Sequence, residues 1–422
     1  MDFKLSTLKN GLRVLTVPMP TLESATVTVW VKTGSRNEED NILGLSHFLE
    51  HMAFKGGKKY PSAKAVSEAI DEVGGEFNAG TSKEFTEFYI RIRAKLLDKA
   101  FDVLSDIVLH PILADKEISK EKGVILEEMN LYEDTPVHRI WDIFEQLIFT
   151  GHPLGRDIIG TKESVPSLKR ADFISYRHKF YYAKNMLLTV AGGVDQKHII
   201  GLANKYFGEV NNGDGEAKNS AIVHSGQNIK LVSKKVEQGH FIVGFPASPL
   251  GDKTRYTDSI LDTLLGTGMS SRLFTEVREK RGLAYSVRSD INRFLDAGYF
   301  AVYAGVDSAK GPLALKVILD QLYGLASKKF AISEKELNKA KEFLKGHLAL
   351  TLEDTRGVNS FFGYEELMLK KTRTVEEVFK KISSVTKEQV YASAQKVFRP
   401  EKIKLAIIGP FKDETKFKNI IS

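Results

Sequence analysis

The chain has 422 residues, 42% hydrophobic and 27% charged, which is the composition of a globular protein with two or more domains. It contains no cysteine, so disulfides and thiolate metal ligands are excluded, and any metal must bind to His, Asp or Glu. The formal net charge is +7, but Lys and Arg are spread among Glu and Asp without a basic stripe, so we expect no nucleic acid partner.

Two features of the sequence bear on its location. Residues 1–17 are interrupted by Lys4, Lys9 and Arg13 and lack an apolar core with a cleavage site, so we expect no secretory signal. The chain has no run of about 18 apolar residues, so we expect no membrane-spanning segment. The expected compartment is therefore the cytoplasm.

The chain begins with patterns that are typical of strands. Residues 3–18 predict two strands around Asn10-Gly11, the strongest short signal for a hairpin. From Ala25 to Lys32, Val alternates with Thr, Trp and Lys, which predicts a strand with one buried face.

Residues 44–54 contain a motif with metal-binding spacing. Apolar residues recur there at intervals of three and four and predict a helix, namely Leu45, Phe48, Leu49 and Met52. On that helix His47 and His51 lie one turn apart on the same face, where two imidazoles can bind one zinc ion. Glu50 lies on the same turn and could take a proton from water at the open metal position, which is the inverzincin arrangement. The alternative is an ordinary helix with two surface histidines.

The next segments predict a layer of strands and helices. A helix is expected after Pro61-Ser62 and ends at Gly74-Gly75. Two strands follow, at 76–81 and 85–93, and then two helices, at about 95–109 and about 115–133. This order predicts a sheet with long helices on one side.

The helix at about 115–133 supplies a third candidate ligand. Glu121 and Glu128 are seven residues apart and share one helix face. We expect this face to point into the protein because apolar residues flank it, namely Val124, Ile125 and Leu131. A buried carboxylate needs a partner, which a zinc ion would supply. The alternative, surface acids on a charged helix, fits Glu127 and Glu133 better than Glu128.

The middle of the chain predicts further helices, a strand and a linker. A helix follows Pro136, and His152 lies in a loop beside Pro153, where we expect a surface residue rather than a ligand. A short strand is expected at 187–191 and a helix at 196–207. Residues 209–226 have the polar, glycine-containing composition of a linker.

The C-terminal half repeats the N-terminal half in degraded form. Residues 334–337 echo residues 115–118 at an offset of 219 (334 minus 115). A repeat of that period indicates duplicated domains, which we place at 1–208 and 227–422 with the linker 209–226 between them. The counterpart of the metal helix, near residues 259–268, has no histidine, so only the N-terminal domain can hold the metal.

Two residues of the C-terminal half could assist hydrolysis. Gly266 to Phe274 opens a predicted helix that carries Arg278, and Tyr285 lies just beyond that helix. An Arg that keeps its proton and a Tyr hydroxyl are suited to hold a peptide carbonyl and to stabilise an oxyanion. Without a family resemblance, we would interpret both residues as structural.

The motif His47-x-x-Glu50-His51, with Glu128 downstream and Glu121 one heptad before it, resembles the insulinase and mitochondrial processing peptidase family. Over nearly its whole length the chain is most similar to the short bacterial processing-peptidase-like members. The resemblance implies an α+β fold of two homologous domains, each with a mixed, mainly antiparallel sheet covered by helices.

The resemblance also implies the roles of individual residues. His47, His51 and Glu128 would bind one zinc ion per chain, Glu50 would be the general base, and Glu121 would be a second acid that supports the ligands. Asn78 and Ala79 would bind the substrate, because they would belong to an edge strand that pairs with the backbone of the substrate. Arg278 and Tyr285 of the C-terminal domain would also bind the substrate and complete the active site.

We therefore expect a zinc metalloendopeptidase that hydrolyses unfolded peptides or short polypeptides bound in extended form inside a chamber. The resemblance implies a homodimer, with a heterodimer of this chain and an inactive homologue as the alternative. A second alternative is a non-catalytic structural or partner-dependent subunit, since relatives of this fold serve as core proteins of a respiratory complex. Loss of a ligand or of the base would mark such a subunit, and the sequence retains all four residues. A third alternative is a metal-independent peptide-binding module.

Overall fold

The computed structural model describes residues 1–213 and 226–421, which divide into two compact units. Among the described residues, unit 1 consists of residues 1–129, 156–213 and 349–375, and unit 2 consists of residues 130–155, 226–348 and 376–421. Each unit contains one sheet with helices packed on it, so the predicted α+β class is confirmed. Residues 214–225 of the predicted linker lie outside the described residues, and the division at 209–226 stays a prediction.

The sheet of unit 1 is mixed but mainly antiparallel. Its strands lie in the order β1 (Lys4–Thr7), β2 (Arg13–Pro18), β6 (Met186–Gly192), β3 (Ser24–Val31), β5 (Thr86–Arg93) and β4 (Glu76–Thr81). β2 and β6 are parallel, and the other neighbouring strands are antiparallel. The hairpin predicted around Asn10-Gly11 is formed by β1 and β2. Within the described residues β4 is an edge strand.

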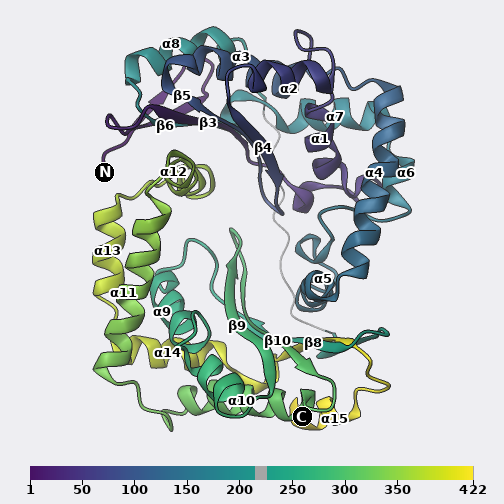
Figure 1. The fold of residues 1–422 in the computed structure, drawn as a ribbon, viewed down its shortest axis with the longest axis vertical. Helices are drawn as coiled ribbons and strands as arrows, with labels where there is room; N and C mark the ends of the chain where they lie inside the picture. Colours follow the sequence, from purple (N-terminus) through teal and green to yellow (C-terminus); the bar gives the residue numbers. More distant parts are fainter. Residues whose placement is uncertain (214–225, 422) are drawn as a thin grey trace. The chain divides into compact units, whose positions relative to one another are not determined.

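Helices cover both faces of this sheet (Figure 1). α2 (Ala63–Asp71), α3 (Leu97–Leu109) and α8 (Gln196–Phe207) pack with β3, β5 and β6 into one apolar core. The opposite face is covered by α12 (Thr355–Leu369), which packs on β6 and β3.

The prediction that β3 has only one buried face was wrong, because α12 covers the second face. The side chains of Thr26, Thr28 and Trp30 are also buried, because α12 lies over them. The Asn359 amide of α12 donates to the backbone carbonyls of Thr26 and Thr189, both at 2.9 Å. The alternation of Val with polar residues therefore marks two buried faces of different polarity.

A second apolar cluster of unit 1 holds the helix with the histidine motif. α1 (Leu45–Ala53), α4 (Asp115–Asp134) and α7 (Arg170–Phe180) contribute its buried side chains, and the short α6 (Ser164–Ser167) adds Val165. α1 also packs against β4. The edge strand and the motif helix are therefore neighbours.

The sheet of unit 2 has the same connectivity as most of the first sheet. Its order is β7 (Ile229–Ser233), β11 (Lys404–Gly409), β8 (Gln238–Pro246), β10 (Gly298–Asp307) and β9 (Ala284–Arg293). β11 is parallel to β7, and the remaining pairs are antiparallel, as in the run β2, β6, β3, β5, β4 of unit 1. This shared topology supports the duplication inferred from the sequence repeat.

The helices of unit 2 also lie on both faces of its sheet (Figure 1). α5 (Pro136–Ile148) covers one face of the sheet. On the other face, the ring of Phe398, which follows the last long helices of the unit, packs against Phe245 and Phe300 of the strands. α9 (Arg255–Leu265) and α10 (Gly311–Ala326) pack on β9 and β10, and α14 (Lys387–Val397) and α15 (Thr415–Ile421) pack on these helices. The remaining long helices are α11 (Glu334–Thr351) and α13 (Val375–Ser383). Each sheet therefore receives one covering helix, α12 or α5, from the other half of the sequence.

No helix within the two described stretches combines the length and the apolar composition needed to cross a membrane.

Candidate metal centre and active site

The N-terminus of α1 is held by a glycine and a buried carboxylate. Gly44 has a φ of 88°, and an added Cβ would lie 2.6 Å from the carbonyl oxygen of Ile159, so only glycine fits there. The Glu38 carboxylate accepts hydrogen bonds from the backbone N–H groups of Gly44 and Ser46, both at 2.7 Å. These bonds satisfy free amides of the first turn and fix where α1 begins.

The predicted amphipathic pattern of α1 is confirmed. The apolar residues of the helix are buried, namely Leu45, Phe48, Leu49 and Met52. His47, Glu50 and His51 lie on the less buried side, and the two imidazole centroids are 4.5 Å apart. The helix therefore presents both histidines and the glutamate together.

The helix α4 brings two carboxylates to α1. Glu121 is buried with 4% exposure and Glu128 is partly buried, so both carboxylates point into the protein as predicted. The predicted flanking residues were partly wrong, because Val124 and Leu131 are 51% and 67% exposed. The apolar residues that flank this face are Ile118, Ile125 and Met129.

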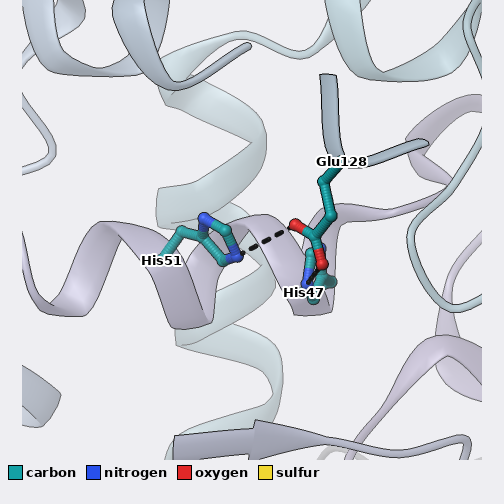
Figure 2. A group of neighbouring side chains, drawn as sticks. All are labelled: His47, His51 and Glu128. Carbon is teal, nitrogen blue, oxygen red and sulfur yellow. Dashed lines mark ion pairs between the residues drawn. The ribbon is translucent and has the colours of Figure 1, made fainter. Parts of the chain in front are cut away.

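The carboxylate of Glu128 faces both imidazoles (Figure 2). Its oxygens lie 3.8 Å from Nε2 of His47 and 3.6 Å from Nε2 of His51, and the three donor atoms lie within 4.8 Å of one another. These distances are too long for hydrogen bonds but suit donors that share a metal ion, since zinc bonds to nitrogen and oxygen are about 2.0–2.2 Å. Two imidazoles and a carboxylate are also a donor set that zinc takes in catalytic sites, so the residues fit the ion.

A metal ligand must be a neutral imidazole or a charged carboxylate; burial favours the neutral form of His47 but opposes the charged form of Glu128. It lowers the pKa of His47 to about 3, with a smaller contribution from His51, so the His47 imidazole stays neutral near pH 7. Burial also raises the pKa of Glu128, while His51 acts in the opposite direction. A divalent cation between these groups would offset the cost of keeping Glu128 charged.

Glu121 contacts His51 and Lys55. The carboxylate accepts a hydrogen bond from Nδ1 of His51 at 2.9 Å, and its other oxygen pairs with Nζ of Lys55 at 2.5 Å. Metal-binding histidines commonly donate their second N–H to a carboxylate, which fixes the ring orientation. Sequence reasoning missed Lys55, which lies in the turn that follows α1.

Glu50 lies on the same helix as the histidines and bonds to the edge strand. Burial raises the pKa of Glu50, and a hydrogen bond from the Thr81 hydroxyl acts in the opposite direction. That hydroxyl donates to Oε2 of Glu50 at 2.5 Å. A higher pKa moves a carboxylate toward the range in which it can exchange protons near neutral pH. Thr81 was also missed: the alternation of β4 places it on one face with Phe77 and Ala79, but does not show that this face meets Glu50.

The other predicted site residues lie on β4 and in unit 2. Asn78 and Ala79 are part of the edge strand, and Oδ1 of Asn78 accepts a hydrogen bond from the Ala79 amide at 2.8 Å. In unit 2 the Arg278 guanidinium lies over the ring of Tyr285, 5.5 Å from its centroid, and the Tyr285 side chain is 75% exposed. These two residues are therefore neighbours, and their part in a zinc site stays a prediction.

The prediction that His152 is a surface residue was wrong. His152 is buried with 7% exposure, and its Nδ1 accepts a hydrogen bond from the backbone amide of Leu154 at 3.1 Å. The bond closes the turn through Pro153, and the imidazole lies against the buried ring of Phe149, with 6.3 Å between the ring centroids.

The chain is similar to known proteins along nearly its whole length. Residues 13–162 match the insulinase family, peptidase family M16, and residues 167–344 match the peptidase M16 inactive domain. An uncharacterized zinc protease of Streptomyces coelicolor is 36% identical over 97% of this chain and 90% of its own length. The uncharacterized zinc protease YmxG of Bacillus subtilis is 36% identical over 96% of this chain and 98% of its own length.

Solved structures show the same fold. A protease from Helicobacter pylori superposes with a TM-score of 0.90 at 24% identity, covering 96% of this chain and 99% of that chain. A chain of complex III2 from Candida albicans has a TM-score of 0.87 at 18% identity, covering 99% and 98%. With curated relatives that match along nearly its whole length, the chain belongs to the insulinase family, peptidase family M16, as one of its short bacterial members.

Proposed function

We propose that the protein is a zinc metalloendopeptidase that hydrolyses unfolded peptides or short polypeptides bound in extended form. The observation that carries this proposal is the convergence of His47, His51 and Glu128 on one point, beside Glu50 of the same helix. The names of the relatives, zinc proteases, support zinc as the metal. We propose one ion per chain.

Zinc in this position supplies a Lewis acid that polarises a carbonyl and lowers the pKa of water. Glu50 takes the proton from the attacking water and returns it to the leaving amine, a general acid and base role for which its raised pKa is suited. Glu121 orients His51 through the Nδ1 hydrogen bond, and His47 stays neutral because it is buried.

The proposed substrate binds as an added strand. β4 has an unpaired edge within the described residues, and an extended peptide can pair with such an edge through main-chain hydrogen bonds. Asn78 and Ala79 lie in that strand, which is adjacent to α1. We propose that Arg278 and Tyr285 hold the peptide carbonyl and the oxyanion that develops from it.

The test pairs metal analysis with cleavage of an unstructured fluorogenic peptide by the parent protein and its Glu50→Gln variant. Glu127→Gln serves as a matched control, because Glu127 is an exposed acid on α4 next to Glu128. The proposal predicts about one zinc per chain in all three proteins and cleavage by the parent and the control alone.

Other outcomes would assign a different function. Zinc in every protein with cleavage by none would favour the structural or partner-dependent subunit. Peptide binding that survives chelation, without cleavage, would favour the metal-independent binding module. An absence of zinc from the parent after incubation with the ion would refute the ligand assignment.

We further propose that the enzyme works in the cytoplasm as a homodimer that encloses a chamber, as the resemblance implies. Sedimentation of the purified chain alone should then give a dimer that cleaves peptide without another protein. A monomer that becomes active only with an inactive homologue would favour the heterodimer.

A further inference from the structure

Thr81 connects the edge strand to the general base. Its Oγ1 donates a hydrogen bond to Oε2 of Glu50 at 2.5 Å. We propose that Thr81 is a positioning residue, which holds the Glu50 carboxylate in the orientation in which it takes the proton from water. This inference rests on the proposed peptidase function and adds a residue to the mechanism.

The position of Thr81 follows from the alternation of β4. Phe77, Ala79 and Thr81 point to the same face of the strand, and Phe77 and Ala79 pack against the apolar core of unit 1. The ring centroid of Phe77 lies 5.4 Å from that of Phe54, the residue that directly follows α1. Thr81, the last residue on this face, therefore reaches α1 with a polar group. Its β-branched side chain has few rotamers, so its hydroxyl is well fixed.

Glu50 depends on this one contact. Within the described residues its carboxylate has no other hydrogen bond and no ion pair. A Glu side chain has three rotatable bonds, so without Thr81 the carboxylate would sample several orientations. The Thr81 hydroxyl occupies Oε2 and leaves Oε1 free to accept a proton. One oxygen thus anchors the side chain while the other is available for proton transfer.

The contact also lies on the strand that is proposed to bind substrate. Thr81 lies in β4 with Asn78 and Ala79, which are three and two positions before it. Pairing of a peptide with β4 would immobilise this strand and with it the hydroxyl that holds Glu50. Loss of Thr81 should therefore affect the chemical step rather than the affinity for peptide.

The test compares Thr81→Val, which has the same shape without the donor, with Thr81→Ser, which keeps the hydroxyl. Thr28→Val is the matched control, because Thr28 is a buried strand residue of unit 1 whose hydroxyl has no hydrogen bond partner among the described residues. We expect Thr81→Val to lower kcat about 10-fold to 100-fold with KM unchanged. Thr81→Ser should recover most of kcat, and Thr28→Val should match the parent.

Three readouts other than activity separate positioning from a structural role. Thr81→Val should keep the zinc content of the parent. In the Glu50→Gln background, which does not cleave, Thr81→Val should leave the Kd for the reporter peptide unchanged. A crystal structure of Thr81→Val should show the Glu50 carboxylate displaced or in several orientations, with β4 and α1 in place.

Each contrary result would overturn the inference. An unchanged kcat, a weakened peptide affinity in the Glu50→Gln background, or a loss of zinc would assign Thr81 no role or another one. If the parent cleaves nothing, the peptidase proposal fails. The crystal structures then still decide about the contact, because an unmoved Glu50 carboxylate in Thr81→Val refutes the positioning role.

Discussion

Nδ1 of His51 donates a hydrogen bond to Glu121 across 2.9 Å, while Nε2 of the same ring lies 3.6 Å from Glu128. The imidazole is thus fixed between two carboxylates of one helix, which are two turns apart. Because the proton on Nδ1 is donated in a hydrogen bond to Glu121, Nε2 carries the lone pair, which points to the place where the three candidate ligands converge.

Removing Glu121 should weaken metal binding without removing a ligand. In Glu121→Ala, His51 loses the group that sets its tautomer, and we expect the affinity for zinc to fall about 10-fold to 100-fold. Competition with a fluorescent chelator measures the Kd. Glu127→Ala, an exposed acid on the same helix, should bind zinc like the parent. Equal affinities in both variants would show that Glu121 does not support the site.

Removal of the metal should abolish cleavage reversibly. Chelation followed by dialysis should leave a folded but inactive protein, and one equivalent of zinc should restore the activity. Glu128→Ala should remain inactive at the zinc concentration that restores the parent, because a third donor is missing. Peptide hydrolysis and circular dichroism, measured on the same samples, test this prediction, and full activity after exhaustive chelation would contradict it.

The stability of unit 1 should depend on pH through Glu38. Burial raises the pKa of Glu38 to about 7 from its usual 4.5, although the amides of Gly44 and Ser46 act in the opposite direction. Because the folded state favours the protonated form, this contribution to stability is fully present below pH 4.5 and is lost as the pH rises through 7. One pKa unit corresponds to about 1.4 kcal/mol, so the rise of the pKa from 4.5 to about 7 corresponds to a loss of about 3 kcal/mol in the free energy of unfolding.

Urea unfolding of the parent and of Glu38→Gln at several pH values measures this effect. The Gln side chain stays neutral, so the free energy of unfolding of the parent should fall relative to that of the variant between pH 4.5 and 8. A difference between the two proteins that does not change with pH would show that Glu38 has an ordinary pKa.

Arg278 and Tyr285 should affect turnover but not metal binding. If they hold the carbonyl and the oxyanion, Tyr285→Phe and Arg278→Ala should each lower kcat about 10-fold to 1000-fold and retain zinc. The Tyr285 side chain is 75% exposed, so loss of its hydroxyl should leave the thermal stability unchanged. Arg281→Ala is the control, because Arg281 is an exposed neighbour that pairs with Glu276. Kinetics equal to those of the control would remove both residues from the mechanism.

A methyl group at Gly363 should destabilise unit 1. An added Cβ would lie 2.8 Å from ring atoms of Trp30, which is buried beneath α12, and we expect a loss of about 1–3 kcal/mol. Gly346 is an exposed glycine of α11 with nothing within 4 Å of an added Cβ, so Gly346→Ala should stabilise by about 0.5–1 kcal/mol. Thermal unfolding of the two variants should show shifts of opposite sign, and shifts of equal sign would contradict the packing of α12 on Trp30.

Local patterns in the sequence were sufficient to predict the position and type of several helices and strands of unit 1. The strand at 76–81 and the helix at 196–207 were predicted with the bounds that the structure has. The spacing of His47 and His51 predicted their common face, because residues on one helix have fixed relations. The heptad spacing placed Glu121 and Glu128 on one face of a second helix, and the family resemblance selected Glu128 as the candidate ligand.

The contacts between distant elements could not be predicted in this way. Nothing in the strand pattern of β3 indicates that α12, more than 300 positions later, covers its second face. The bond between Thr81 and Glu50 likewise depends on how α1 packs against β4, which no local period encodes. Sequence periodicity gives the faces of single elements, whereas the pairing of faces is decided by packing of the whole chain.

The cover of the first sheet by α12 has a consequence for the synthesis of the protein. Asn359, whose amide caps the carbonyls of Thr26 and Thr189, lies 170 positions after Thr189. At about 5–20 residues per second, a ribosome needs roughly 10–30 s to add that stretch. Until then the nascent chain exposes the ring of Trp30, which α12 covers in the finished protein, so the first unit completes its folding only when the second is largely made.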